Sequence, residues 1–233
     1  MTTVAIMQPY LFPYVGYYQL AAKSDIFVFL DDVPFIKRGY IHRNWLVGAG
    51  QQPVHFSIPV EKMSQNRNIN DHCYVFDGGK LRRKIVHLYG NSSQYKKISP
   101  LVDQVVHTAG SRVVASVNAE SITRTAHIMG LKTIFLTASE IAPKRNCRGQ
   151  DRILALCREL GASHYINLPG GKTLYEPHIF REQGVRLQFL ESFVEPLITP
   201  DGRPWHPSFL HYLFTTSAEG IQQLLCKAKL TDS

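Results

Sequence analysis

Two acidic side chains, Asp31 and Asp32, directly follow an apolar run, and a group of basic and polar side chains follows them. A carboxylate in such a position can accept a proton from an amine or hold the amine in place. Lysine and arginine bind phosphate groups. The accompanying side chains are Lys37, Arg38, His42, Arg43 and Asn44. We therefore expect a site that joins proton transfer to phosphate binding; the alternative is a solvated turn with surface charge.

A segment rich in tyrosine and proline, QPYLFPYVGYYQL, lies upstream of these acids. Tyrosine hydroxyls can donate hydrogen bonds to an oxyanion, a role for which we consider Tyr10 and Tyr17. Alternatively, Pro9 simply ends a strand and Tyr10 packs in the core. The further candidates for substrate contact in this segment are Gln8, Pro9, Tyr14 and Gly16.

A third candidate segment, NLPGGKTLY, occupies residues 167–175. Two adjacent glycines let the backbone approach a ligand closely and can turn amides toward an anion. Pro-Gly-Gly is also an ordinary turn. The candidate binding residues here are Asn167, Gly170, Gly171 and Tyr175.

The elements around the first segments form a strand–loop–helix–strand unit. Apolar residues 4–7 and 26–30 predict strands, and residues 14–23 predict an amphipathic helix. Such units form parallel sheets, and ligands bind at the carboxyl ends of the strands in open sheets of this kind. The loops that carry the candidate residues would therefore meet at one edge.

Apolar segments that predict strands begin near Val4, Ile26, Val54, Thr133, Tyr165 and Leu187. They predict an α/β fold with a mostly parallel, Rossmann-like sheet and helices on both faces. The length suits a single domain, residues 1–233, and helical periodicity predicts a helical insertion or layer at about 79–130.

The composition limits the location and the chemistry of the protein. No 18-residue apolar run occurs, so no membrane span is expected, and a secretory signal is absent, which favours the cytoplasm. The cysteines are widely spaced without a CxxC pair and are expected as reduced thiols, with no metal site. They are Cys73, Cys147, Cys157 and Cys226.

A formal net charge of +8 favours acidic partners. Sugar nucleotides, coenzyme A and an acidic acyl carrier protein fit this charge. Short basic clusters such as Lys80–Lys84 and Lys96–Lys97 are not interleaved with aromatic residues as in single-strand binders, so nucleic acid is not expected.

The chain resembles the WbqC family at both ends. The resemblance rests on QPYLFPYVGYYQL and DIFVFLDDVPFIKRGYIHRN, and on INLPGGKTLYEPHIF with GVRLQFLES. Those bacterial proteins are often encoded among genes for O-antigen and other glycans or secondary metabolites. The resemblance implies transfer of glycine, or another aminoacyl or acyl group, to an amino sugar.

The carboxyl-terminal part departs from the family pattern. In the run WHPSFLH, Ser208 matches a family serine and is a candidate for substrate contact, whereas His211 stands where relatives usually have an acid. His211 can act as an acid–base catalyst near neutral pH. The alternative is a helix histidine packed beside Tyr212.

The order strand, proline-rich loop, helix, strand is also similar to the topology of HIGH-motif nucleotidyltransferases. Those enzymes use histidines in this loop to hold nucleotide phosphates, whereas here no histidine precedes His42. The imidazoles that stabilise charge in nucleotidyl transfer are therefore missing from the loop, although the topology can be shared.

Three functions remain open from the sequence. The first is an enzyme that transfers an aminoacyl or acyl group to the amine of a sugar nucleotide or similar acceptor. Coenzyme A or a phosphopantetheine thioester is the donor considered, no cofactor is firmly implied, and no covalent nucleophile is required. The second is an ATP-dependent ligase or nucleotidyltransferase that activates a carboxylate. The third is a non-catalytic ligand-binding protein.

Overall fold

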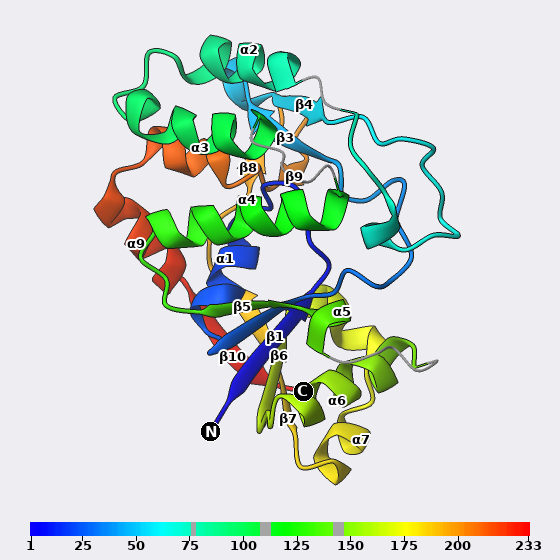
Figure 1. The fold of residues 1–233 in the computed structure, drawn as a ribbon. Helices are drawn as coiled ribbons and strands as arrows, with labels where there is room; N and C mark the ends of the chain where they lie inside the picture. Colours follow the sequence, from blue (N-terminus) through cyan, green and yellow to red (C-terminus); the bar gives the residue numbers. More distant parts are fainter. Residues whose placement is uncertain (76–77, 108–112, 142–146) are drawn as a thin grey trace.

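A six-stranded sheet forms the centre of the structure, a computed structural model in which residues 1–75, 78–107, 113–141 and 147–233 are described (Figure 1). Its strands lie in the order β10-β7-β6-β1-β2-β5. All neighbours pair in parallel except β10, which is antiparallel to β7. The strands are β1 (Thr3–Met7), β2 (Ile26–Phe29), β5 (Ile134–Thr137), β6 (His164–Asn167), β7 (Arg186–Ser192) and β10 (Ala228–Asp232).

Alternating side chains of the strands enter two separate cores. Val4 and Ile6 of β1 join one buried cluster, and Ala5 between them joins the other. This is the expected result of the two-residue period of a strand that is covered on both faces. The predicted Rossmann-like α/β sheet with helices on both faces is therefore confirmed.

The core that contains Val4 and Ile6 is covered by α6 and α7, with α5 at its edge. The core that contains Ala5 is covered by the other helices (Figure 1). On the α6 side lie α5 (Ala138–Ile141), α6 (Gly149–Glu159) and α7 (Pro177–Glu182). On the other side lie α1 (Val15–Ala22), α2 (Gly78–Tyr89), α3 (Tyr95–His107), α4 (Val114–Ile128), α8 (Leu210–Thr215) and α9 (Ala218–Cys226). Helices α2–α4 fill the described part of 79–130, where the sequence predicts a helical insertion.

Helix α1 is buried on all sides, although the sequence predicts an amphipathic helix there. The sheet covers one side and α9 another. The Gln19 amide donates to the carbonyls of Leu224 (2.7 Å) and Lys227 (3.1 Å), so even the polar residue of α1 has an internal partner.

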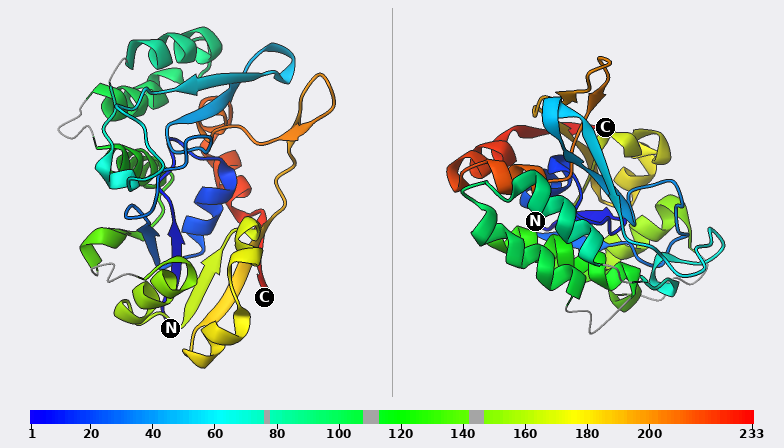
Figure 2. Two further views of the ribbon diagram at one scale, coloured as in Figure 1. Left: turned by 90° about the vertical axis from the view of Figure 1, so that its right-hand side faces the viewer. Right: turned by 90° about the horizontal axis from the view of Figure 1, so that it is seen from above.

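Two antiparallel hairpins lie outside the central sheet and project on the same side of the molecule (Figure 2). One consists of β3 (Arg43–Val47) and β4 (Pro53–Ser57), and the other of β8 (Leu197–Ile198) and β9 (Pro204–Trp205). Three short 3₁₀ segments complete the elements of the described chain: η1 (Ala49–Gln51), η2 (Ile69–Asp71) and η3 (Pro169–Leu174).

The strand predicted near Val54 does not belong to the central sheet, and this part of the prediction is wrong. It forms β4, which pairs with β3, and the sixth sheet strand is the carboxyl-terminal β10. The physical reason is visible in β4 itself, where Phe56 is buried between exposed His55 and Ser57. A strand with one buried face suits a hairpin, whereas inner strands of the central sheet such as β1 and β6 are buried on both faces.

No helix among the described residues is long and apolar enough to cross a membrane.

Candidate active site

The strand order places a topological switch point between β1 and β6. Numbered along the chain, the strands lie in the order 6-5-4-1-2-3, so the connections leaving β1 and β6 run in opposite directions. In open α/β sheets, ligands bind in the crevice at the carboxyl ends of such a strand pair. The segment after β1 and the start of η3 after β6 line this crevice here.

A pocket of about 930 Å³ lies at this position, and we call it the switch-point pocket. Several segments that are distant in sequence contribute to its wall, including both hairpins. The lining residues are Tyr14, Gly16, Tyr40, Trp45, Pro53, Leu168, Pro169, Leu190, Glu191, Ser192, Thr199, Arg203, Pro204, Trp205 and His206.

Five aromatic or imidazole rings of the described residues line the switch-point pocket, those of Tyr14, Tyr40, Trp45, Trp205 and His206. The Tyr14 ring lies 5.8 Å from the His206 ring, and the Tyr40 ring 5.5 Å from that of Trp45, measured between centroids. Trp45 and Trp205 are the two tryptophans of the chain, and both line the pocket. Such a lining suits a ring-shaped ligand that packs against aromatic faces.

The loop after β1 is held in a defined conformation beside the pocket. Phe12 is buried with a φ of 43°, a left-handed conformation that costs free energy in a residue other than glycine. Its carbonyl accepts hydrogen bonds from Asn44 Nδ2 (2.8 Å) and Ser208 Oγ (2.7 Å). The predicted residues Asn44 and Ser208 are themselves buried, and they contact this loop without lining the pocket.

Residues 8–10 and Tyr17 are tied into the core beneath this loop. The Tyr17 hydroxyl donates to the carbonyl of Gln8 (2.5 Å), and Asn118 Nδ2 donates to the carbonyl of buried Pro9 (2.9 Å). The Tyr10 ring packs 5.9 Å from that of Tyr17. Burial raises the pKa of both Tyr10 and Tyr17, which keeps their hydroxyls neutral. Tyr17 is fully buried, and none of these residues lines the pocket.

Gly16 contributes to the pocket by the absence of a side chain. A Cβ at this position would lie 2.6 Å from Cε2 of Tyr14. Glycine therefore allows the Tyr14 ring to fold over the first turn of α1, where both residues line the pocket.

The loop after β6 reaches the pocket through Leu168 and Pro169, not through its two glycines. Asn167 Nδ2 donates to the hydroxyls of Tyr165 (3.0 Å) and Tyr175 (2.9 Å). The Gly171 amide donates to the Leu168 carbonyl (2.9 Å), and Gly170 is exposed. Asn167, Gly171 and Tyr175 thus fix the shape of this loop.

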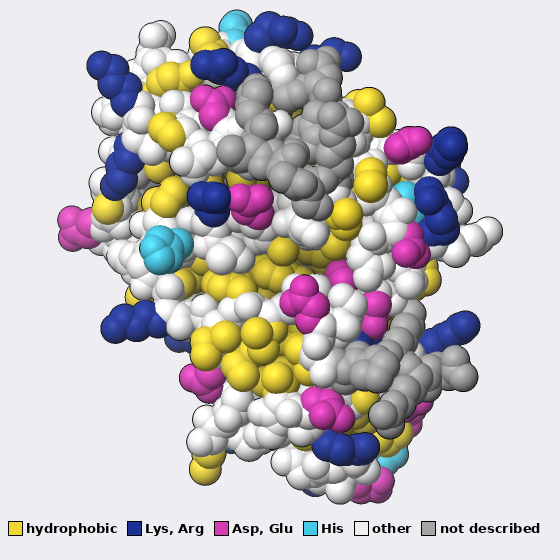
Figure 3. Space-filling model, in the orientation of Figure 1, with side chains coloured by type: hydrophobic (Ala, Val, Ile, Leu, Met, Phe, Trp, Pro, Cys, Tyr) yellow, Lys and Arg dark blue, Asp and Glu magenta, His cyan; other side chains and the backbone are white. Residues whose placement is uncertain are grey.

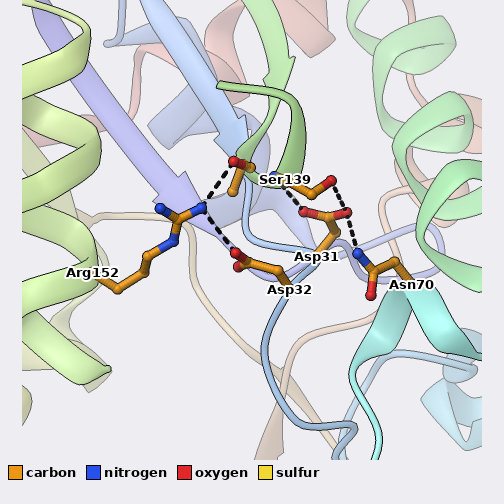
Figure 4. Close-up of polar contacts among 6 residues, drawn as sticks. Asp31, Asp32, Asn70, Ser139 and Arg152 are labelled. Atoms are coloured by element: carbon orange, nitrogen blue, oxygen red, sulfur yellow. Dashed lines mark hydrogen bonds and ion pairs between the residues drawn. The ribbon is translucent and has the colours of Figure 1, made fainter. Parts of the chain in front are cut away.

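The acid pair lies at the ends of β2 and β5 (Figure 4), and neither acid lines the switch-point pocket. Asp31 is 3% exposed, and its carboxylate accepts hydrogen bonds from the Ser139 amide (3.0 Å), Ser139 Oγ (2.6 Å) and Asn70 Nδ2 (2.9 Å). Asp32 is 6% exposed and forms an ion pair with Arg152 Nη2 (2.8 Å). Arg152 also donates to the carbonyl of Ala138 (2.9 Å).

Asp31 lines a second, smaller pocket of about 210 Å³ together with Asn70, Ser139 and Glu140. Figure 3 shows acidic side chains beside an apolar band between α4 and β5 on this face. The structure therefore brings the loops after β1 and β6 together, but it does not bring the acid pair to them.

The basic side chains after β2 are divided between solvent and the pocket rim. Lys37 and Arg38 are exposed and do not line the switch-point pocket. Arg43 is held over the Trp45 ring, with its Cζ atom 5.8 Å from the ring centroid. Its Nε donates to the carbonyl of Gly39 (3.1 Å).

Two histidines near the carboxyl terminus occupy different surroundings. His206 lines the pocket, and His211 Nδ1 lies 3.3 Å from the hydroxyl of Tyr89 outside the pocket. Burial lowers the pKa of His206, and it lowers the pKa of His211 to about 4. Both rings are therefore neutral at pH 7, but only His206 can meet a ligand in the pocket.

Sequence reasoning missed Tyr40, Trp45, Trp205 and His206 as pocket residues. A signal was available at Trp205–His206, which directly precedes the segment containing Ser208. Nothing in the sequence indicated that the two hairpins would stand side by side across the loop after β1.

Neither a cluster of metal-ligating side chains nor a cysteine in the switch-point pocket is found among the described residues. No group of three or more histidine, cysteine, aspartate or glutamate side chains is placed to hold a metal ion there. Burial raises the pKa of Cys157 to about 12, and no cysteine lines the switch-point pocket.

Comparison with known proteins gives one family and one relative. The model of the WbqC-like protein family matches residues 8–213. An uncharacterised protein of Mycobacterium tuberculosis, Rv1507c, is 20% identical over 195 residues, which is 82% of this chain and 83% of the relative. No solved structure matches the chain.

Proposed function

Because the chain belongs to the WbqC-like protein family, we propose that it is a biosynthetic enzyme that transfers an acyl or aminoacyl group to an amine. The acceptor is an amino sugar carried on a nucleotide, and glycine is one candidate for the transferred group. The donor is a thioester of coenzyme A or of phosphopantetheine. The reaction belongs to glycan or secondary-metabolite assembly, and we place it in the cytoplasm.

The observation that supports this proposal most is the combination of aromatic rings and a neutral imidazole in one pocket at the switch point. Tyr14, Trp45 and Trp205 offer faces for a sugar or a base. His206 supplies a group that can accept a proton. The Nδ1 atom of His206 is buried and makes no hydrogen bond within the described residues, so no described protein group fixes the position of its proton.

The chemistry needs no covalent nucleophile. The acceptor nitrogen attacks the thioester carbonyl carbon, a C–N bond forms, and the C–S bond breaks. The nitrogen loses a proton to the His206 imidazole, which can return it to the leaving thiolate. Burial lowers the pKa of His206, which keeps the ring unprotonated at neutral pH and able to act as a base.

The remaining predicted residues support this reaction from outside the pocket. Asn44 and Ser208 position the loop after β1, and Asn167 and Tyr175 position the loop after β6. We assign Asp31 and Asp32 to the attachment of α5 and α6 to the sheet, because their carboxylates already hold partners in those segments.

The test is product formation by the purified chain. Acetyl- and glycyl-thioesters are offered with nucleotide-linked amino sugars, and mass spectrometry detects an acceptor heavier by one acyl group. His206→Gln is the matched variant and should lose the activity, while His211→Gln should keep it.

The same assay separates the other two functions. Magnesium-dependent release of pyrophosphate from ATP with a free carboxylic acid would replace the proposal with a ligase. Ligand-induced thermal stabilisation without any product from any donor would replace it with a binding protein.

A further inference from the structure

The outer wall of the switch-point pocket continues along one face of the β3–β4 hairpin. Trp45 pairs with His55 across the two strands, and Arg43 lies two residues before Trp45. Because side chains two residues apart share a face of a strand, Arg43, Trp45 and His55 lie on the same face. Trp45 and Pro53 of this face line the pocket.

Three basic side chains, two from the hairpin and one from α2, lie close together next to the pocket. The Arg43 guanidinium lies over the Trp45 ring of β3. The His55 ring of β4 lies 5.5 Å from the same Trp45 ring, measured between centroids. Lys84 of α2 reaches the same strand, where its ammonium donates to the carbonyl of His55. Helix α2 lies beside the hairpin in both views (Figures 1 and 2).

No acidic side chain of the described residues forms an ion pair with the cations of this group. Neither Arg43 nor Lys84 forms an ion pair within the described residues, whereas Arg82 on the same helix approaches Asp103 at 3.6 Å. The pKa of His55 is lowered by burial first, and then by the charges of Arg43 and Lys84. Arg43 and Lys84 therefore both act on His55 through their positive charges, and an anion placed among the three side chains would be attracted to these two charges.

The guanidinium is also held in place before any ligand arrives. Arg43 Nη2 donates to the carbonyl of Arg38 (2.5 Å), and Arg43 Nε donates to that of Gly39. A fixed guanidinium loses less conformational freedom when it binds a phosphate, which favours binding.

We propose that Arg43, His55 and Lys84 form a phosphate-binding shelf for a ligand whose ring lies in the switch-point pocket. The ligand is then a phosphorylated compound, and the shelf holds its phosphate beside Trp45. This inference rests on the proposed function only for the identity of the ring; two sources of the phosphate, the acceptor nucleotide and coenzyme A, share the same chemistry.

Tryptophan fluorescence gives a direct readout, because both tryptophans of the chain line the pocket. The full-length protein is titrated with uridine diphosphate and with uridine, and separately with coenzyme A and with pantetheine. The phosphorylated member of at least one pair should bind more tightly than its phosphate-free counterpart, and the advantage should shrink as salt is added. The pair that shows it identifies the source of the phosphate.

Arg43→Ala and Lys84→Ala should each weaken binding of that phosphorylated ligand by about tenfold. They should weaken binding of the phosphate-free counterpart much less. Lys96→Ala on α3 removes an exposed positive charge away from the pocket and is the matched control. Circular dichroism of each variant checks that it is folded.

Equal binding of phosphorylated and phosphate-free ligands would overturn the shelf, as would losses no larger than that of Lys96→Ala. Because binding is measured without turnover, the result is independent of the transfer reaction. If the phosphorylated ligand binds more tightly as expected but no product is formed, only the proposed function is contradicted.

Discussion

The acid pair and the switch-point pocket lie at the same edge of the sheet but differ in how their polar groups are engaged. Asp31 and Asp32 are buried, and their carboxylates hold Ser139, Asn70 and Arg152. In the residues that line the pocket, by contrast, the buried atoms Trp205 Nε1 and His206 Nδ1 make no hydrogen bond within the described residues. The comparison teaches that charge at strand ends does not by itself indicate an available side chain, because such groups can already be bonded within the fold.

The largest expected effect concerns the acid pair. Asp32→Asn removes one charge of a buried ion pair with Arg152, whose side chain is 2% exposed. We expect a loss of about 3–5 kcal/mol in the free energy of unfolding. Urea denaturation measures it. The control is Glu120→Gln, which removes an exposed pair with Arg124 on α4 and should cost about 0.5 kcal/mol. An equal loss in the free energy of unfolding for the two variants would contradict the structural role assigned to Asp32.

A comparable effect, on activity and not on stability, is expected in the pocket. His206→Gln should lower kcat/KM of the transfer reaction by about 10²-fold, since it removes the proton acceptor. His211→Gln should leave kcat/KM unchanged, because that ring lies against Tyr89. Steady-state kinetics on both variants provide the test, and a larger loss for His211→Gln would contradict the account.

A smaller effect is expected where the loop after β1 is anchored. Ser208→Ala removes the hydroxyl that bonds the Phe12 carbonyl, and we expect a loss of about 1–3 kcal/mol in the free energy of unfolding. Because the loop shapes the pocket, kcat/KM should fall as well. Thr215→Ala also removes a hydroxyl-to-carbonyl bond, but at an exposed site, and is the matched control.

The smallest expected effect is a displacement of the pH profile. Burial lowers the pKa of His206 below its ordinary 6.5, so the base stays neutral to a lower pH than a free histidine. Activity should therefore rise with pH along an acid limb whose midpoint lies below 6.5. A midpoint above 6.5 in kcat/KM would mean that another group, or a differently placed His206, controls the proton.

The parts of the fold that were predictable are those with strong local signals. Apolar runs located β1, β2 and β6, and the turn residues around them located the loops that line the pocket. The strand near Val54 was predicted, but its partner β3, their pairing as a hairpin, and β10 were not recognised, since these strands alternate or are short and polar. Residues 228–232, for example, contain Lys229 and Asp232.

The candidate site was predictable only in its general position. The expected partnership of the acids with the loop after β1 did not account for Ser139 and Arg152, which follow them by more than a hundred residues in the chain. Whether a carboxylate is available or already bonded depends on such distant partners. The positions of Trp45 and Trp205 depend likewise on the packing of two hairpins that have no local signature.

A crystal structure with a nucleotide-linked amino sugar bound tests the central claim most directly. The account predicts ligand density in the switch-point pocket, with the ring between Tyr14 and the two tryptophans and the amine within hydrogen-bond distance of His206. Density in the small pocket beside Asp31 and Glu140, with the switch-point pocket empty, would contradict it.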